Sequence, residues 1–186
     1  MCMNEYTGGC VDAKDILESG ISPEDIAYMD IALEEARMAA DEGEVPIGAV
    51  VVYDGQVIAR AHNRREQDKD PAAHAEHSAM VMASRVLDRW RLSGCTVYVT
   101  LEPCLMCAGL MINARIDRCV YGAPDPKGGA LGTLYDISHD ARLNHAFEVC
   151  PGVRSDEAAQ LLRDFFRARR KNRQKETGAF LPRADN

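Results

Sequence analysis

Hydrophobic residues recur at helical spacing near the start and near the end of the chain. The first set is Ile26, Met29, Leu33, Ala36 and Ala40, and the second is Ala158, Leu161, Leu162, Phe165 and Phe166. Ser22 and Pro23 suit the cap and the first position of a helix that ends near Gly43, and Ser155 suits the cap of the later helix. The pattern therefore predicts two amphipathic helices that flank the rest of the fold.

Short runs of β-branched and other apolar residues between these helices predict a sheet. The expected strands cover residues 47–53, 56–61, 96–101, 118–121 and 147–150. Asp54-Gly55 is a strong hairpin signal between the first two strands. Further helices are expected from His74 to Leu87 and from Pro103 to about Asn113. The strand–helix–strand unit over residues 96–121 implies two parallel strands joined by a right-handed crossover.

The connecting segments are polar or rich in glycine and proline. Arg64 to Asp70 is expected to be a charged, solvated loop, and Trp90 to anchor a loop by packing. Residues 122–132 contain several Gly and Pro residues, and such a loop can approach a substrate closely.

The composition favours one globular domain that works inside a cell. The chain has 186 residues, of which 46% are hydrophobic and 27% charged. Neither a membrane-spanning run nor a signal segment is visible in the sequence. Residues 1–22 are expected to be an acidic, mobile extension or an addition to the natural chain, and residues 23–186 the single domain. Seven cysteines, an odd number, favour a reducing compartment, the cytoplasm, over a disulfide framework.

Two short segments about thirty residues apart carry the candidate chemistry. They are His74-Ala75-Glu76 and Pro103-Cys104-Leu105-Met106-Cys107. One imidazole and two thiolates are natural zinc ligands, and a catalytic zinc needs three protein ligands and one open position for water. Cys104 and Cys107 share one face of a helix, at its positive end if Pro103 is the first helical residue. This set predicts one zinc site.

Glu76 decides which kind of zinc site is predicted. Zinc lowers the pKa of a bound water to about 7, and a nearby carboxylate can take that proton and pass it to a substrate. The combination of H-x-E with a later P-C-x-x-C is the known signature of zinc-dependent nucleobase deaminases. We therefore predict that Glu76 is the catalytic acid–base. The alternative is a structural zinc whose fourth ligand is a spare His or Cys.

The sequence around these residues resembles the bacterial tRNA-specific adenosine deaminase family. Segments 44–50, 63–64, 72–76, 98–109 and 164–167, with Asp125 and Lys127, carry the resemblance, which runs from about Tyr28 to about Arg173. The family converts the wobble adenosine of an anticodon to inosine. The resemblance implies one zinc per subunit and a cytidine deaminase-like three-layer α/β/α sandwich. Its central mixed five-stranded sheet carries helices on both faces.

The resemblance also implies roles for residues whose chemistry alone is ambiguous. It implies a base-positioning Asn63, a pocket lined by Val45, Pro46 and Ala75, and anticodon-loop contacts by Asp125, Lys127 and Asn144. Without it, Asn63 is more typical of a turn after a strand, and the last three are only polar loop residues. Pro124, Gly128 and His77 depart from the family pattern. His77 is expected on a helix surface or at an interface rather than as a fourth ligand.

The last predicted helix changes sign along its length. Between Arg163 and Lys175 the sequence has seven basic residues and one acidic residue, on a chain whose formal net charge is −7. Such a local basic stripe is typical of phosphate binding, and an adjacent aromatic ring can stack on an unpaired base. This indicates RNA contacts by Phe166, Arg169 and Arg170. The alternative is a solvated helix end whose cations complement the helix dipole.

The predicted partner is a tRNA anticodon stem-loop, and the resemblance implies a homodimer and no membrane partner. Two other classes of function stay open. A deaminase of a free base or nucleoside, of guanine or cytosine type, would use the same zinc chemistry without the basic helix. A non-catalytic, zinc-stabilised RNA-binding module would need the helix but not Glu76.

Overall fold

A computed structural model describes residues 21–178 of the chain, with side chains up to Gln174. The acidic extension predicted over residues 1–22 therefore lies almost entirely outside the described residues, and so do residues 179–186. None of the described helices combines the length and the apolar character that crossing a bilayer requires.

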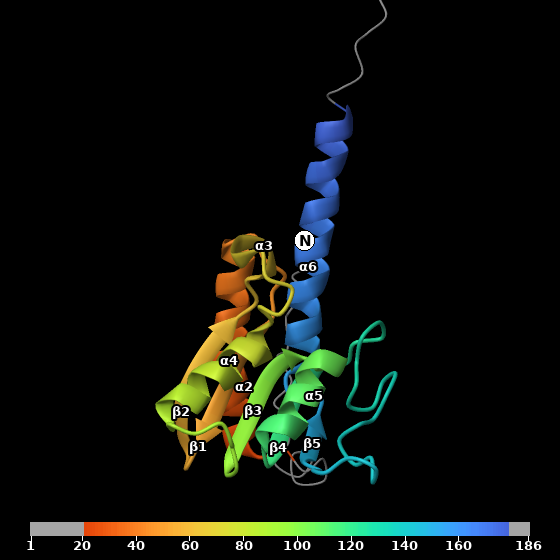
Figure 1. Cartoon of the computed structure of the whole chain (residues 1–186). Helices are drawn as coiled ribbons and strands as arrows, with labels where there is room; N and C mark the ends of the chain where they lie inside the picture. The colour runs from red at the N-terminus through yellow and green to blue at the C-terminus, as the bar shows by residue number, and fades with distance from the viewer. Residues whose placement is uncertain (1–20, 179–186) are drawn as a thin grey trace, which may run out of the picture.

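The centre of the fold is a five-stranded mixed sheet (Figure 1). Its strands are β1 (Gly48–Tyr53), β2 (Gln56–His62), β3 (Cys95–Leu101), β4 (Arg118–Ala123) and β5 (Glu148–Pro151), in the order β2-β1-β3-β4-β5. β1 pairs antiparallel with β2 and β3, whereas β3, β4 and β5 are parallel. Asp54 and Gly55 both adopt positive φ, as the predicted hairpin turn requires. The five predicted strands are thus confirmed, with ends that differ by one or two residues.

Helices cover both faces of this sheet. They are α2 (Pro23–Asp41), α4 (Ala75–Val86), α5 (Leu105–Ala114) and α6 (Ser155–Gly178). Val51, Val97 and Val99 pack with α4 and α5, whereas the alternate positions Val50, Val52 and Tyr98 pack with α2. Ala123 packs against α6 on the α2 side. The predicted α/β/α sandwich is confirmed, because side chains that alternate along a strand point to opposite layers.

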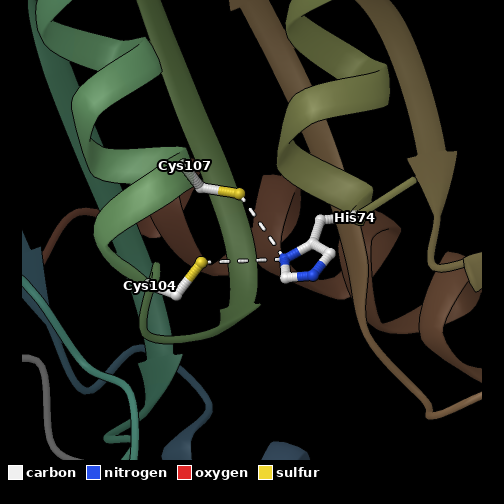
Figure 2. Close-up of side chains that lie close together, drawn as sticks. All are labelled: His74, Cys104 and Cys107. Atoms are coloured by element: carbon white, nitrogen blue, oxygen red, sulfur yellow. Dashed lines mark hydrogen bonds between the residues drawn. The ribbon is translucent and has the colours of Figure 1, made fainter. Parts of the chain in front are cut away.

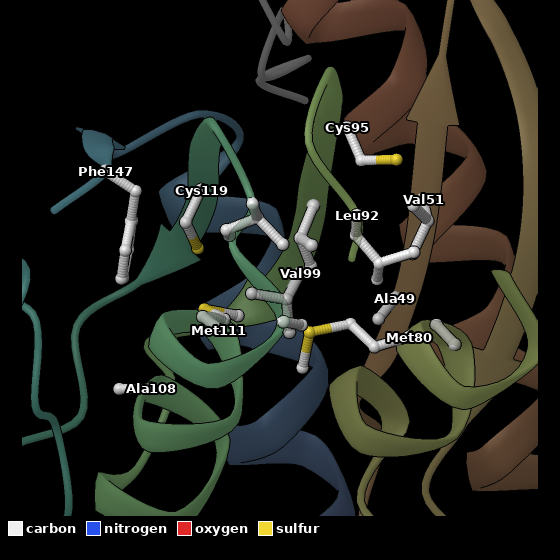
Figure 3. Packing of buried hydrophobic residues seen from close by; sticks show 14 of the residues in the cluster. Ala49, Val51, Met80, Leu92, Cys95, Val99, Ala108, Met111, Cys119 and Phe147 are labelled. Atoms are coloured by element: carbon white, nitrogen blue, oxygen red, sulfur yellow. The ribbon is translucent and has the colours of Figure 1, made fainter. Parts of the chain in front are cut away.

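The larger core lies between the sheet and the α4–α5 layer (Figure 3). Met80 from α4, Met111 from α5 and Leu92 from the loop between α4 and β3 are almost completely buried there with Val99. Each such side chain contributes about 1.5–3 kcal/mol on burial. This packing holds α4 and α5 side by side, which matters because both helices carry ligands at their N-termini.

The first helix begins as the sequence predicts. The Ser22 hydroxyl accepts a hydrogen bond from the Asp25 N–H at 3.1 Å, and the Asp25 carboxylate accepts one from the Ser22 N–H at 3.0 Å. The two bonds form a capping box that satisfies N–H groups left free at the start of the helix.

Three other predicted local features were wrong. Residues predicted as a loop contain the one-turn helix α3 (Arg65–Asp68), because the Gln67 N–H bonds to the buried Glu44 carboxylate at 2.8 Å. Pro103 is not the first helical residue, since Cys104 itself is the N-cap of α5. Ser155 is the first residue of α6 rather than its cap, because the Ala158 N–H already bonds to the Arg154 carbonyl.

The prediction for Trp90 was also wrong. Its side chain is 60% exposed and lies under the Arg91 guanidinium, 4.6 Å from the ring centroid. Leu92, two residues later, is the residue that packs into the core at this corner.

Candidate metal centre

The three predicted ligands come from the N-termini of two helices. His74 is the N-cap of α4, Cys104 is the N-cap of α5, and Cys107 lies in the first turn of α5. β3 ends at Leu101 and delivers the chain to Cys104 after two residues. The side chains of His74 and Cys104 make no capping bond of their own, so both are free to face a ligand.

The ligand atoms have the spacing of a tetrahedral zinc site. The His74 Nδ1 atom lies 3.8 Å from the Cys104 Sγ atom and 3.7 Å from the Cys107 Sγ atom (Figure 2). All three atoms lie within 4.8 Å of one another. Zinc–sulfur and zinc–nitrogen bonds of usual length at a tetrahedral angle place nitrogen and sulfur about 3.6 Å apart. The three residues therefore fit a zinc ion, and no other His, Cys, Asp or Glu between residues 21 and 174 joins the cluster as a fourth ligand.

The surroundings of the ligands favour a cation. Hydrogen bonds from Cys107 and His74 lower the pKa of Cys104 to about 3, which favours the thiolate form of this side chain. The negative charge and hydrogen bond of Cys104, together with burial, raise the pKa of Cys107 far above its usual value. The N-termini of α4 and α5 lie at the cluster, and the positive ends of their dipoles stabilise the thiolate form in which cysteine binds a metal. Two adjacent thiols can both ionise only when a cation lies between them, as a bound metal would.

Glu76 lies in the first turn of α4, only 4% exposed. Burial raises the pKa of its carboxyl group, and the negative Cys104 thiolate adds to that effect. Glu76 does not belong to the His/Cys/Cys cluster, and neither does His77, which is partly exposed. A buried carboxylate beside a metal site, but not in its ligand set, has the properties of a proton carrier.

Asn63 is buried at the end of β2, next to the segment that carries His74. It is 3% exposed, and the N–H of the following residue, Arg64, bonds to the Ala73 carbonyl at 3.0 Å. The Asn63 Nδ2 group donates to the buried Glu44 carboxylate at 3.0 Å. Of the other residues predicted for the pocket, Pro46 and Ala75 are buried and Val45 is partly exposed. Glu44 thus fixes the orientation of the Asn63 amide.

The predicted RNA-contacting loop residues lie in two places. Asp125 and Lys127 occupy one turn after β4, where the Lys127 N–H bonds to the Asp125 carboxylate at 2.9 Å. This turn is connected to the cysteine segment, because Gly129 forms an isolated bridge with Cys104. Asn144 is exposed on a separate part of the long loop before β5 and is held by the Arg115 guanidinium. The structure therefore brings Asp125 and Lys127, but not Asn144, into the turn beside Cys104.

The basic part of α6 lies beyond the sheet. Figure 1 shows this helix running past the ends of the strands. Phe166 is 41% exposed, and Arg169 and Arg170 are also exposed. A groove between α6 and the turn after β4 is lined by Pro126, Lys127, Leu162, Arg163, Phe166, Arg167 and Arg170. Two segments predicted separately to contact RNA therefore form the two sides of one groove.

Sequence reasoning missed the importance of two buried carboxylates. Glu44 and Glu102 are 1% and 2% exposed. Among the described residues, Glu44 accepts hydrogen bonds from Asn63 and from Gln67 of α3, and Glu102 accepts them from the loop after β4. Their positions in the sequence could have indicated their burial. Glu44 follows Gly43, where the first helix ends, and Glu102 directly follows a strand of buried residues. A charged residue at such a point needs internal partners.

The fold and the His/Cys/Cys cluster define a deaminase of the cytidine deaminase-like class. In agreement, the model of the MafB19-like deaminase family matches residues 24–170. The tRNA-specific adenosine deaminase of Bacillus subtilis (strain 168) is 49% identical over 150 residues, which cover 81% of this chain and 93% of the relative. The chain belongs to the tRNA-specific adenosine deaminase family.

Solved structures agree with this assignment. One comes from a study of A-to-I editing by tRNA:A34 deaminases at the wobble position of transfer RNA. It matches with a TM-score of 0.71 and 47% identity over 73% of this chain and 99% of that one. A guanine deaminase from Nitrosomonas europaea matches with a TM-score of 0.64 and 25% identity over 89% of this chain and 98% of that one.

Proposed function

We propose that this protein is a zinc-dependent enzyme that hydrolyses the wobble adenosine of a tRNA anticodon to inosine and releases ammonia. The observation that carries the proposal is the His74/Cys104/Cys107 cluster with its open fourth position beside the buried Glu76. The membership of the family and the 49% identity to a named tRNA-specific adenosine deaminase support the substrate. His74, Cys104 and Cys107 would hold one zinc ion in each subunit.

Glu76 moves the protons of the reaction. The zinc ion supplies an acidified water when it is bound. Glu76 accepts a proton from that water and delivers it to the adenine ring nitrogen next to C6, while a carbon–oxygen bond forms at C6. Glu76 then takes a second proton from the new C6 hydroxyl and delivers it to the amino group. The carbon–nitrogen bond breaks, the C6 oxygen becomes a carbonyl, and ammonia leaves. The raised pKa of Glu76 suits both transfers, because in each of them the carboxylate must first bind a proton and then release it.

The base is held by residues around the cluster. Asn63, oriented by Glu44, positions the base, and Val45, Pro46 and Ala75 form the wall of the pocket. The target nucleotide must leave the stack of the anticodon loop to enter this pocket, and an unpaired loop makes that step inexpensive.

The rest of the anticodon loop binds in the groove between α6 and the turn after β4. Lys127 on one side and Arg170 on the other offer cations to phosphates, and Phe166 offers a ring to an unpaired base. Asp125 holds the turn, Arg169 extends the basic surface along α6, and Asn144 contacts the loop from the segment before β5. Clustering of these cations on an otherwise acidic chain favours one well-defined RNA path.

A homodimer is part of the proposal. The outer surface of the α4–α5 layer exposes large apolar side chains, namely Met82, Val86, Trp90, Leu105 and Met106, each at least 40% exposed. Large apolar side chains exposed on one layer of a fold are typical of a surface that contacts another subunit. Leu105 directly follows the ligand Cys104, so a second copy on this surface would border the pocket. Light scattering should give twice the monomer mass, and Met82→Glu should reduce it.

The proposed compartment is the cytoplasm. Cys95, Cys119 and Cys150 are buried and free in the described part of the chain, as a reducing environment requires.

The proposed activity is tested with four substrates in parallel. The zinc-loaded protein is incubated with an anticodon stem-loop that carries a wobble adenosine, with a matched cytidine loop, and with free adenosine and guanine. We expect inosine only in the adenosine loop. Product from a free base or nucleoside would support the proposed zinc chemistry but contradict the proposed RNA substrate. Zinc-loaded protein that binds the loop without any turnover would favour a non-catalytic RNA-binding module.

A further inference from the structure

Glu102 is a buried carboxylate that the proposed mechanism does not use. It lies between the end of β3 and the ligand Cys104 and is only 2% exposed. A buried charge is unstable unless hydrogen bonds or a cation compensate it. No salt bridge is found for it among the described residues, and all its compensation comes from hydrogen-bond donors.

All of these donors belong to one loop. The Glu102 Oε1 atom accepts from the N–H groups of Leu131 at 3.0 Å and Thr133 at 3.1 Å. The Oε2 atom accepts from the Asp125 N–H at 3.0 Å and from the Thr133 hydroxyl. The carboxylate is therefore bonded to both ends of the segment 125–133, which we name the substrate loop.

The middle of the substrate loop packs directly on Glu102. A Cβ atom on Gly129 would lie 2.3 Å from the Glu102 Oε2 atom, so only a glycine allows this approach. The Ala130 N–H also bonds to the Pro103 carbonyl at 2.9 Å. The loop is thus wrapped around one side chain that is two residues from a metal ligand.

The far side of the same loop forms the RNA groove. Pro126 and Lys127 line that groove opposite α6, and the Asp125 N–H that bonds to Glu102 lies two residues before Lys127. Movement of Asp125 away from Glu102 would therefore move Lys127 relative to the basic helix.

We propose that Glu102 is a positioning residue that holds the substrate loop in its RNA-binding shape and ties it to the metal-binding segment. The proposal rests on the proposed function in that it takes the partner of the loop to be the anticodon stem-loop. Glu102 contacts neither the reacting base nor the metal ligand atoms, and it acts through the backbone of Asp125, Leu131 and Thr133.

Glu102→Gln is a sharp probe because it changes one acceptor into a donor and keeps the size. Its carbonyl oxygen can still accept from Leu131 and Thr133. Its amide nitrogen then faces the Asp125 N–H and the Thr133 hydroxyl. The hydroxyl can turn and accept, whereas the Asp125 N–H loses its acceptor. The damage is therefore expected at Asp125 alone.

The experiment compares wild type, Glu102→Gln and the control Glu148→Gln, which makes the same chemical change on a side chain that is 69% exposed. Amide hydrogen exchange, bound zinc and the kinetics on the stem-loop are measured for each. For Glu102→Gln we expect exchange at Asp125 to rise roughly tenfold or more, with full zinc content. KM should rise roughly tenfold, with kcat changed less than about threefold. The control should match wild type.

Thr133→Val is the second variant, for use if Glu102→Gln does not fold. It removes one donor from the same oxygen and should raise KM roughly threefold. Unchanged exchange at Asp125, or faster exchange with an unchanged KM, would overturn the proposal, and so would loss of zinc with a fall in kcat alone. If wild type neither binds nor deaminates the stem-loop, the proposed function fails. The hydrogen-exchange rates of Glu102→Gln then still test whether Glu102 holds the substrate loop.

Discussion

The ion pair between Asp25 and Arg118 allows a stability prediction with a magnitude. Asp25 is 1% exposed at the start of α2, and Arg118 begins β4. The Arg118 Nη1 and Nη2 atoms donate to the two Asp25 carboxylate oxygens at 2.5 and 3.0 Å. The Tyr98 hydroxyl donates to the same carboxylate at 2.9 Å. One buried group therefore joins the first helix to two strands of the sheet.

Arg118→Met removes the cation and keeps much of the side-chain volume. Removal of one partner of a buried ion pair costs about 3–5 kcal/mol. The Arg118 side chain keeps 20% exposure and the Asp25 side chain 2%, so water partly screens the pair and the lower value applies. We expect a loss of about 3 kcal/mol in the free energy of unfolding, or a fall in Tm of roughly 6–12 °C.

The pH dependence follows from the direction of the pKa shift. Burial opposes ionisation of Asp25, but hydrogen bonds from Arg118, Ser22 and Tyr98 outweigh it, and its pKa is lower than the usual 3.8. A carboxyl with a lowered pKa stabilises the fold above its unfolded pKa, and this contribution is lost as the pH falls below that value. The penalty of Arg118→Met should therefore be full at pH 7 and smaller near pH 3.

Urea unfolding of wild type, Asp25→Asn, Arg118→Met and the double variant measures the pair directly. We expect the double variant to lose at least about 1 kcal/mol less than the sum of the single losses. Losses that add within about 0.3 kcal/mol, or a penalty that is the same at both pH values, would refute the reasoning.

Four other predictions follow from the site and its supports. Glu76→Ala should abolish turnover, a loss of at least about 10²–10⁴ in kcat, with zinc still bound; loss of zinc would contradict the role of Glu76. Chelation of zinc should abolish activity and destabilise the α4–α5 layer in thermal melts, and added zinc should restore both. Gly48→Ala should destabilise by at least about 2 kcal/mol in urea, because its Cβ would lie 2.1 Å from the Ala32 carbonyl oxygen. Arg170→Ala should weaken stem-loop binding and reduce by about one the slope of the logarithm of the binding constant against the logarithm of the salt concentration. Arg37→Ala on α2 should do neither.

Periodicity and turn chemistry predicted most of the fold because the relevant signals are local. The strand over residues 47–53 and the Asp54-Gly55 turn are readable within a few residues, and both were confirmed. Helix starts were less well predicted, as Pro103 and Ser155 show, because a cap is defined by one backbone bond. The helix at Arg65–Asp68 could not be predicted, since it depends on the distant Glu44.

The sequence predicted the metal ligands of the site but not the residues that support them. His74, Cys104 and Cys107 were found from type and spacing, and the structure places them together. Nothing in the spacing of Glu102 indicated that its partners lie 23 to 31 residues later in the chain. Such long-range hydrogen bonds depend on the tertiary fold, so the residues that support a site are harder to predict than its ligands.

The most direct test of the central claim is a single-turnover assay of the zinc-loaded protein on an anticodon stem-loop with a wobble adenosine. The product is identified by mass and by digestion to nucleosides. We predict inosine at that position only, with release of one ammonia for each inosine and full dependence on Glu76. Inosine at other adenosines, or deamination of free guanine with an untouched stem-loop, would contradict the account.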